Sequence, residues 1–331
     1  MFAGMNRPFG FLTLALCAML LAWAADAAGE CYDADQLTAA EPPPITGLAQ
    51  ASGPTMRDRL GRMVAPVTVN GQGPFRFIVD TGANRSVLSQ RLADQLGLTP
   101  IGTGEVHSVH GVTIAPLVEV QSLNYGALPL LANAMPLLEG AVLAGEQGLL
   151  GVDGMSGRRL RLDFERRCIE ISPSRAPRRS QGWQLVRGEL RFGHLVVVAG
   201  MIAGQRINII IDTGSDSTLA NVALRERLRG TVRIDRARTA YARAYTAGEP
   251  IVLDSAILIP RMVMGEVEIR HIIAYVGDFH IFSIWNFIEQ PTLLIGMDVL
   301  SQTRALEIDY LRGDVHFRLR RRPELGSRIP E

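Results

Sequence analysis

Two copies of one short pattern constrain the fold of this 331-residue chain more than any other feature. The first, FIVDTGANRS, runs from Phe77 to Ser86, and the second, IIIDTGSDST, runs from Ile209 to Thr218. In each copy an Asp-Thr-Gly triplet directly follows a run of apolar residues typical of a buried strand. A carboxyl group at the inner end of such a strand is costly unless it is paired, protonated or used in function. The repetition therefore predicts two similar lobes, each placing one aspartate at the same point.

Each triplet belongs to a longer unit that occurs twice. A hairpin pattern rich in Val, Ile and Phe precedes the triplet, a short helix pattern follows it, and an apolar-apolar-Gly element closes the unit. The hairpins are expected at 63–82 and 194–214, the helices at 89–96 and 221–228, and the closing glycines are Gly151 and Gly296. The triplet aspartates are 132 residues apart and the closing glycines 145 residues apart. The second copy is therefore longer, and we expect its extra residues around 277–290.

These units predict a mainly β protein with two tandem lobes. A segment rich in Pro, Ser and Arg separates the copies, as is common for linkers. The expected divisions are a signal peptide (1–27), a loosely ordered lead-in (28–62), a first lobe (63–172), a linker (173–182), a second lobe (183–319) and a basic tail (320–331).

The N-terminus has the pattern of a secretory signal peptide. Arg7 precedes the apolar stretch Phe9–Ala25, and Ala25-Asp26-Ala27 offers a small-x-small cleavage site. An uncleaved anchor is the alternative, because the stretch approaches the shortest length that spans a bilayer. Cleavage predicts an exported protein, in a bacterial periplasm or secreted, with no membrane contact afterwards. In that oxidising compartment Cys31 and Cys168 could form a disulfide, or both could stay free thiols.

Composition excludes some partners and the motifs suggest one chemistry. The formal net charge of +1 gives no field that would attract nucleic acid.

If the two copies face each other about a pseudo-twofold axis, Asp80 and Asp212 meet in one site. Two carboxyl groups about 3 Å apart cannot both ionise, so one acts as acid and the other as base on one water molecule. This chemistry requires no metal and no cofactor.

The two triplets and their closing glycine elements resemble aspartic proteases of the retropepsin and pepsin type. The resemblance covers roughly residues 63–319, is closest to bacterial exported retropepsin-like members within each unit, and is similar to pepsin in its single-chain duplication. It implies two β-barrel lobes related by a pseudo-twofold axis, an active site between them, and a polypeptide substrate. The residue roles it implies are catalysis by Asp80 and Asp212, interlocking threonines Thr81 and Thr213, close-approach glycines Gly82 and Gly214, and support by Ser215.

The residue three positions after each aspartate differs between the copies. Ala83 has no hydroxyl, whereas Ser215 could donate a hydrogen bond to a carboxylate and favour its charged form. We therefore expect Asp212 to be the more readily ionised aspartate.

The resemblance also implies hairpin flaps over the substrate. Their tips are expected near Gly111 and at 245–248, and Tyr241 and Tyr245 are candidate cleft residues. Ordinary half-exposed strand tyrosines are the alternative for the last two.

The sequence leaves two alternative interpretations of the function and assembly open. A degenerate protease fold could bind peptides without cutting them, and each lobe could pair with its counterpart in a second chain. We expect instead that one chain forms the pseudo-dimer. His107 and His110 are expected at the surface, and Asp163 and Asp309 are expected to be structural residues at strand ends.

Overall fold

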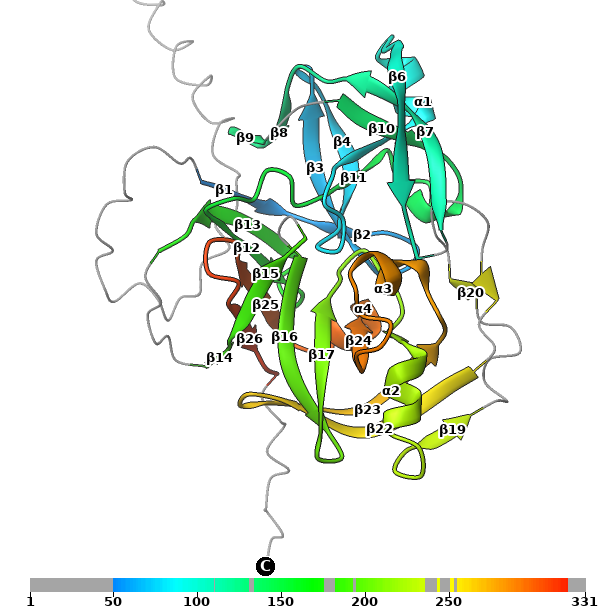
Figure 1. Cartoon of the computed structure of the whole chain (residues 1–331). Coiled ribbons are helices and arrows are strands. Elements are labelled where there is room, and N and C mark those ends of the chain that lie inside the picture. The colour runs from blue at the N-terminus through cyan, green and yellow to red at the C-terminus, as the bar shows by residue number, and fades with distance from the viewer. Residues whose placement is uncertain are drawn as a thin grey trace, which may run out of the picture.

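The computed structural model describes residues 50–109, 111–130, 134–175, 182–192, 195–235, 243–244, 251–252 and 255–320. The expected signal peptide, Cys31, His110, Tyr241 and Tyr245 all lie outside these residues. In Figure 1 the first lobe lies at the top, the second lobe at the bottom, and a third sheet lies beside both. The fold is mainly β, with two tandem lobes, as the sequence predicts.

The first lobe is a curled ten-stranded sheet. Its strands follow the order β6 (Pro100–His107), β7 (Val112–Glu119), β10 (Ala134–Leu138), β5 (Val87–Ser89), β11 (Gly148–Leu150), β4 (Gln72–Val79), β3 (Met63–Val69), β8 (Leu123–Tyr125) and β9 (Leu128–Leu130), and β2 (Met56–Arg57) pairs with β3. Helix α1 (Gln90–Gln95) and a 3₁₀ turn (Ala141–Leu143) complete the lobe.

The second lobe contains a closed six-stranded barrel. Its strands are β16 (Leu195–Ile202), β17 (Gln205–Ile211), β24 (Thr292–Ile295), β18 (Leu219–Ala220), β23 (Val267–Val276) and β22 (Ser255–Met264). Strand β22 pairs back onto β16 and closes the ring. The remaining elements are β15 (Gly188–Arg191), β19 (Arg233–Asp235), the pair β20 (Arg243–Ala244) and β21 (Ile251–Val252), and the helices α2 (Val222–Arg227), α3 (His280–Ile284) and α4 (Met297–Leu300).

A six-stranded sheet joins the two lobes. Its order is β1 (Ala51–Pro54), β13 (Cys168–Pro173), β12 (Arg158–Asp163), β25 (Ala305–Asp309), β26 (Val315–Arg318) and β14 (Trp183–Val186). The central pair, β12 with β25, is antiparallel and brings together the strands that end in Asp163 and Asp309, one from each repeat. The sheet is thus the shared base on which the lobes are mounted.

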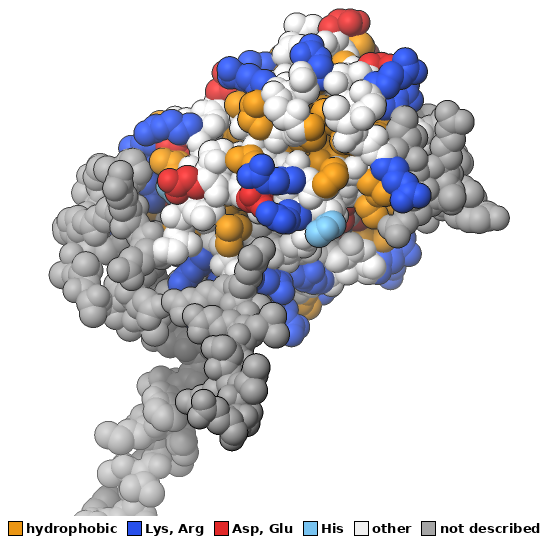
Figure 2. Space-filling view, turned by 90° about the horizontal axis from the view of Figure 1, so that it is seen from below, with side chains coloured by type: hydrophobic (Ala, Val, Ile, Leu, Met, Phe, Trp, Pro, Cys, Tyr) orange, Lys and Arg blue, Asp and Glu red, His pale blue; other side chains and the backbone are white. Residues whose placement is uncertain are grey.

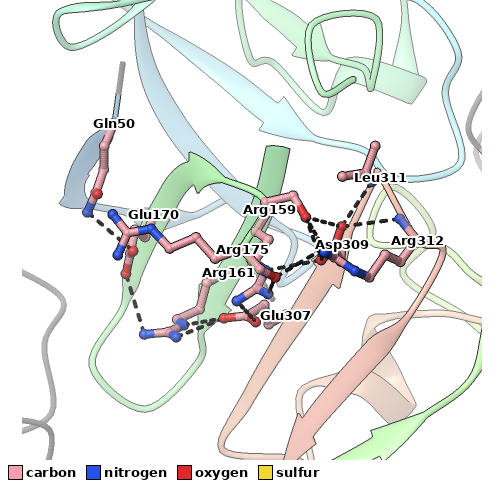
Figure 3. A network of polar contacts seen from close by, with 10 residues as sticks. Gln50, Arg159, Arg161, Glu170, Arg175, Glu307, Asp309, Leu311 and Arg312 are labelled. Atoms are coloured by element: carbon pink, nitrogen blue, oxygen red, sulfur yellow. Dashed lines mark hydrogen bonds and ion pairs between the residues drawn. The ribbon is translucent and has the colours of Figure 1, made fainter. Parts of the chain in front are cut away.

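A network of ion pairs crosses the shared sheet, as Figure 3 shows. Arg161 bonds Glu307 at 2.8 Å, and Arg159 bonds Asp309 at 3.1 Å. Both acceptors are buried, and buried charges are tolerated when they are paired and hydrogen-bonded. These contacts link the first repeat to the second within one chain.

Several expected elements are confirmed. The β3–β4 and β16–β17 hairpins precede the two triplets, and α1 and α2 occupy the predicted helix positions. Each of these helices begins at a side-chain cap, with Ser89 accepting from the Leu92 amide and Asn221 accepting from the Leu224 amide.

The strand-end aspartates are structural, as expected. Asp163 accepts hydrogen bonds from the amides of Glu165 and Arg166, and Asp309 accepts from the amides of Leu311 and Arg312. Each aspartate therefore stabilises the turn after its strand.

The lead-in segment differs from the expectation. Residues 51–57 form β1 and β2, because β1 pairs with β13 and β2 pairs with β3. Cys168 is disulfide-bonded, and its partner lies outside the described residues.

The extra residues of the second repeat contain α3. They bring Phe279, Ile281, Phe282, Trp285 and Phe287 into an apolar cluster beside the barrel.

The described residues contain no helix long and apolar enough to span a membrane. Figure 2 shows Arg side chains spread among apolar and uncharged groups over one face of the molecule.

Candidate active site

Asp80 and Asp212 stand at the ends of two equivalent buried strands. Strand β4 runs parallel to β11, and β17 runs parallel to β24. The Asp80 amide donates to the Leu150 carbonyl at 3.0 Å, and the Asp212 amide donates to the Ile295 carbonyl at 3.1 Å. The same strand pairing in each lobe therefore places each aspartate where its strand leaves the core.

The triplet threonines interlock across the two lobes. The Thr81 hydroxyl donates to the Ile211 carbonyl at 2.8 Å and accepts from the Thr213 amide at 3.0 Å. The Thr213 hydroxyl makes the reciprocal bonds, at 2.7 Å to the Val79 carbonyl and 3.2 Å from the Thr81 amide. Both side chains are buried. These four bonds join the lobes directly beneath the aspartates.

The triplet glycines let each loop approach the aspartate of the other lobe. A Cβ atom on Gly82 would lie 2.8–2.9 Å from the Asp212 carboxyl atoms, and one on Gly214 would lie 2.1–2.4 Å from those of Asp80. No side chain larger than hydrogen fits at these distances. The structure thus brings the two carboxyl groups together at the interface between the lobes.

The backbone holds each carboxyl group in the same way. One oxygen of Asp80 accepts from the amides of Gly82 and Ala83, and one oxygen of Asp212 accepts from those of Gly214 and Ser215. This symmetry leaves the second oxygen of each group free of these backbone bonds.

The two carboxyl groups differ in their acidity. Burial raises the pKa of Asp80, while the backbone bond from Gly82 and the charge of Arg62 oppose that rise. Burial and the neighbouring charge of Asp80 together raise the pKa of Asp212 well above its ordinary value. A hydrogen bond between the two carboxyl groups lowers the pKa of Asp80 and raises that of Asp212. Asp80 is therefore the more readily ionised member.

The expected role of Ser215 in this asymmetry is wrong. Its hydroxyl donates to the Ser217 carbonyl at 2.7 Å rather than to a carboxylate. The prediction failed because the turn offers the hydroxyl a nearer backbone acceptor.

The closing glycines pack beneath the triplet loops. A Cβ on Gly151 would lie 2.5–2.8 Å from backbone atoms of Ala83 and Arg85, and one on Gly296 would lie 2.5–2.9 Å from those of Ser215 and Ser217. Each glycine therefore allows the supporting strand to contact the loop backbone.

The sequence analysis did not predict a role for two further aspartates near the triplet loops. Asp153 accepts from the Ser86 hydroxyl at 2.7 Å, and Asp298 accepts from the Thr218 hydroxyl at 2.8 Å. Each hydroxyl also accepts the amide of the closing glycine. The signal was present, because an aspartate stands two residues after each closing glycine.

A buried ion pair beside the aspartates was also missed. Arg62 is only 3% exposed, bonds Asp58 at 2.7 Å, and donates to the Gly214 carbonyl at 3.1 Å. The repeat carries no signal for this pair, because the strand pairings match Arg62 with Leu195 in the second copy.

A cavity of about 400 Å³ opens above the two aspartates. Its wall includes Asp80, Asp212 and mostly apolar side chains from both lobes, such as Leu138, Leu219 and Trp285. A larger hollow of about 580 Å³ lies on the first lobe beside α1, and neither aspartate lines it. The cavity between the lobes is therefore the candidate substrate site.

The hairpin β6–β7, called the flap hairpin below, covers one side of this cavity. Its tip includes Gly111, whose carbonyl accepts from the Ser108 amide, so a hairpin turn lies where the first flap is expected, and its action as a flap stays a prediction. Residues 104–109 line the cavity.

The flap hairpin also reaches the second lobe. His107 Nδ1 lies 3.2 Å from His280 Nε2, and the His280 amide donates to the Val109 carbonyl at 2.9 Å. The side chain of His107 is 41% exposed, as expected of a surface residue, but it also joins the flap hairpin to α3.

Among the described residues no group of three or more His, Cys, Asp or Glu side chains is arranged to hold a metal ion.

The comparisons identify the family. The family model for aspartyl proteases matches residues 65–153 and 198–299, which contain both triplets and both closing glycines. A search of curated proteins found no match to the chain. The chain belongs to the aspartyl protease family.

Proposed function

We propose that the protein is an aspartic endopeptidase in which Asp80 and Asp212 of one chain form the catalytic dyad. The observation that carries the proposal is the hydrogen-bonded carboxyl pair on the wall of a cavity between the lobes. Two adjacent carboxyl groups with unequal pKa values provide one acid and one base.

The asymmetry of the dyad assigns the two roles. The ionised Asp80 takes a proton from a water molecule, which attacks the carbonyl carbon of the scissile peptide bond. The protonated Asp212 donates its proton to the carbonyl oxygen, and the product is a gem-diol. Collapse of the gem-diol transfers a proton to the nitrogen, breaks the C–N bond and releases an acid and an amine.

The cavity supports an extended polypeptide substrate with apolar side chains near the scissile bond. The flap hairpin and α3 enclose the site from opposite lobes and contribute apolar groups such as Val106, Ile281 and Ile284. Excluding water from the dyad strengthens the electrostatic interactions that stabilise the transition state.

Contacts within the chain support a single-chain assembly. The interlocked threonines and the pairing of β12 with β25 join the lobes without a second molecule. We propose that the enzyme is a monomer with an internal pseudo-dimer.

The enzyme is further proposed to act after export. The disulfide at Cys168 supports an oxidising compartment, because disulfides persist there. The mass of the mature protein tests this: loss of residues 1–27 is expected, and an intact N-terminus in the membrane fraction would contradict export.

The test of the activity is cleavage of an unfolded protein at mildly acidic pH. We expect cleavage by the wild type and a loss of at least about 10²-fold in the Asp80→Asn and Asp212→Asn variants, since a general acid–base group contributes about 10²–10⁴-fold. Circular dichroism serves as the folding control. Equal cleavage by the wild type and both variants would reject the dyad, and peptide binding without cleavage by the wild type would indicate a binding module.

A further inference from the structure

The strongest feature that the proposed reaction does not use is the buried arginine beside the dyad. Arg62 lies in the turn between β2 and β3, before the first triplet strand. Its guanidinium reaches the second lobe, where Nη1 donates to the Gly214 carbonyl at 3.1 Å. Gly214 is the residue that packs directly against the Asp80 carboxyl group. Gly214 therefore lies between the guanidinium and the Asp80 carboxyl group, while its own amide binds Asp212.

The charge of Arg62 is paired with that of Asp58, but one nitrogen of its guanidinium makes no hydrogen bond within the described part of the chain. Nε bonds Asp58 Oδ2 at 2.7 Å and Nη1 bonds the Gly214 carbonyl, whereas Nη2 is buried with no hydrogen-bond partner among the described residues. Arginine stays protonated in proteins, so the group cannot discharge itself. A buried charge of this kind acts on nearby ionisable groups with little screening by solvent.

The turn before β3 holds the arginine in place. Asp58 Oδ1 accepts from the amides of Leu60 and Arg62 at 2.9 and 2.8 Å, while its other oxygen binds the guanidinium. The Arg62 side chain is 3% exposed and that of Asp58 is 0% exposed. The ion pair is thus a rigid part of the fold and not a surface contact.

The buried ion pair of Arg62 and Asp58 occurs in only one of the two repeats. The strand pairings match Val64 with Val197, so the position that corresponds to Arg62 in the second copy is Leu195, and the repeat does not supply a second arginine. The backbone cradles of the two aspartates are otherwise equivalent. A symmetric pair would share its proton equally, and an additional charge on one side removes that symmetry.

We propose that Arg62, held by Asp58, is the positioning residue that keeps Asp80 ionised and thereby confines the shared proton to Asp212. This inference rests on the proposed function, because it assigns the base and the acid of that reaction. The charge of Arg62 lowers the pKa of Asp80, in the direction that the inference requires.

Other ionisable groups near the dyad do not reproduce this effect. Burial and the charges of both aspartates raise the pKa of Tyr310, so its hydroxyl is neutral when the dyad works. Burial raises the pKa of Asp216, while Arg62 lowers it and Asp58 raises it. Arg62 is the cation whose charge lowers the pKa of Asp80.

The experiment follows each aspartate separately and does not depend on activity. Aspartate is labelled with ¹³C at the carboxyl carbon, and the Asp80→Asn and Asp212→Asn variants assign the two resonances. In the wild type we expect the Asp80 resonance to titrate at lower pH than that of Asp212. The acid limb of the kcat/KM profile should follow the Asp80 titration.

Four variants separate a charge effect from a structural one. Asp58→Asn/Arg62→Met removes both charges and keeps an acceptor for the turn amides, so the Asp80 titration and the acid limb should move to higher pH. On that limb kcat/KM should fall at least about threefold relative to the plateau, as expected when a neighbouring opposite charge is removed. Asp58→Asn alone leaves the cation uncompensated and should move both to lower pH. Arg62→Lys should stay closer to the wild type than Arg62→Met.

The possible outcomes distinguish this inference from the proposed function. An unchanged Asp80 titration in a folded Asp58→Asn/Arg62→Met variant would overturn the role of Arg62, even when the dyad is essential for cleavage. Movement of Asp58→Asn and the double variant in the same direction would also overturn it. Should the double variant not fold, the opposed shifts of Asp58→Asn and Arg62→Met decide the question. Cleavage that survives both aspartate replacements would instead reject the proposed function and leave the titrations interpretable.

Discussion

The interlocked threonines allow a quantitative prediction about what holds the lobes together. Replacing Thr81 by valine keeps the shape of the side chain and removes its hydroxyl group. That hydroxyl donates to the Ile211 carbonyl and accepts from the Thr213 amide, at 2.8 and 3.0 Å. Thr81 is 1% exposed and Thr213 is 0% exposed, so water cannot replace the lost partner.

The expected size follows from the two groups left behind. A buried donor or acceptor without a partner costs about 1–3 kcal/mol, so Thr81→Val should lower the free energy of unfolding by about 2–6 kcal/mol. Thr81→Ser is the matched control, because it keeps both bonds and loses one methyl group, worth about 1 kcal/mol. Domain stabilities are commonly about 5–15 kcal/mol, so the difference between the variants should be readily measured.

Urea denaturation of the full chain provides the assay. Thr81→Val should unfold at clearly lower urea than Thr81→Ser, and Thr213→Val should show a loss of similar size because its hydroxyl makes the reciprocal bonds. If the unfolding free energies of Thr81→Val and Thr81→Ser agree within about 0.5 kcal/mol, the interlock does not stabilise the lobe interface and the reasoning fails.

Three further predictions follow from the same geometry. The raised pKa of Asp212 means that its proton binds more tightly in the folded chain, so this residue's contribution to stability falls as pH rises through the folded pKa. In denaturation experiments Asp212→Asn should therefore be more stable than the wild type at pH 7, and this gain should disappear at pH 3. Equal stability of the two proteins at both pH values would contradict the prediction. Gly214→Ala places a Cβ 2.1–2.4 Å from the Asp80 carboxyl atoms and should lower kcat/KM by about 10²-fold or more, since misplacement of a reacting group by about 1 Å costs that much. Gly102→Ala is the control and should keep wild-type activity, because its Cβ meets no atom within 4 Å. Similar losses of activity in both variants would argue against a steric cause. His280→Ala removes the side-chain contact between α3 and the flap hairpin. Amide hydrogen exchange at the hairpin tip should therefore accelerate, while exchange in the β12–β25 pair stays unchanged. An unchanged exchange rate at the tip would show that the contact does not hold the hairpin.

The sequence predicted the parts of the fold that the repeat encodes twice. Both hairpins, both short helices and both closing glycines stand where the pattern placed them, because each depends on local residue types. The meeting of Asp80 with Asp212 was also predictable, since two copies of one unit suggest a pseudo-twofold axis.

The shared sheet was beyond the reach of local patterns. It pairs β12 with β25 and β1 with β13, and these partners come from distant parts of the chain. Residues 51–54 also lack strong apolar periodicity, so the sequence predicted a loose segment where pairing with an existing strand edge forms β1.

The source of the asymmetry of the dyad was predicted wrongly, because the Ser215 hydroxyl donates to the Ser217 carbonyl. The sequence drew attention to Ser215 because a hydroxyl beside a carboxylate is visible in the motif. The charge that we propose instead is that of Arg62, which is distant in sequence from the motif of the second lobe and reaches it only through the fold. Single residues that break a repeat are therefore worth examining as closely as those that keep it.

The central claim is that both aspartates of one chain act together, and a mixing experiment tests it most directly. The Asp80→Asn and Asp212→Asn variants are purified, checked for folding, and assayed for peptide cleavage alone and in an equimolar mixture. The account predicts wild-type cleavage that is proportional to concentration, and no cleavage by either variant or by their mixture. Recovery of activity in the mixture would show that the dyad forms between two chains, and cleavage by either variant alone at the wild-type rate would show that the pair is not catalytic.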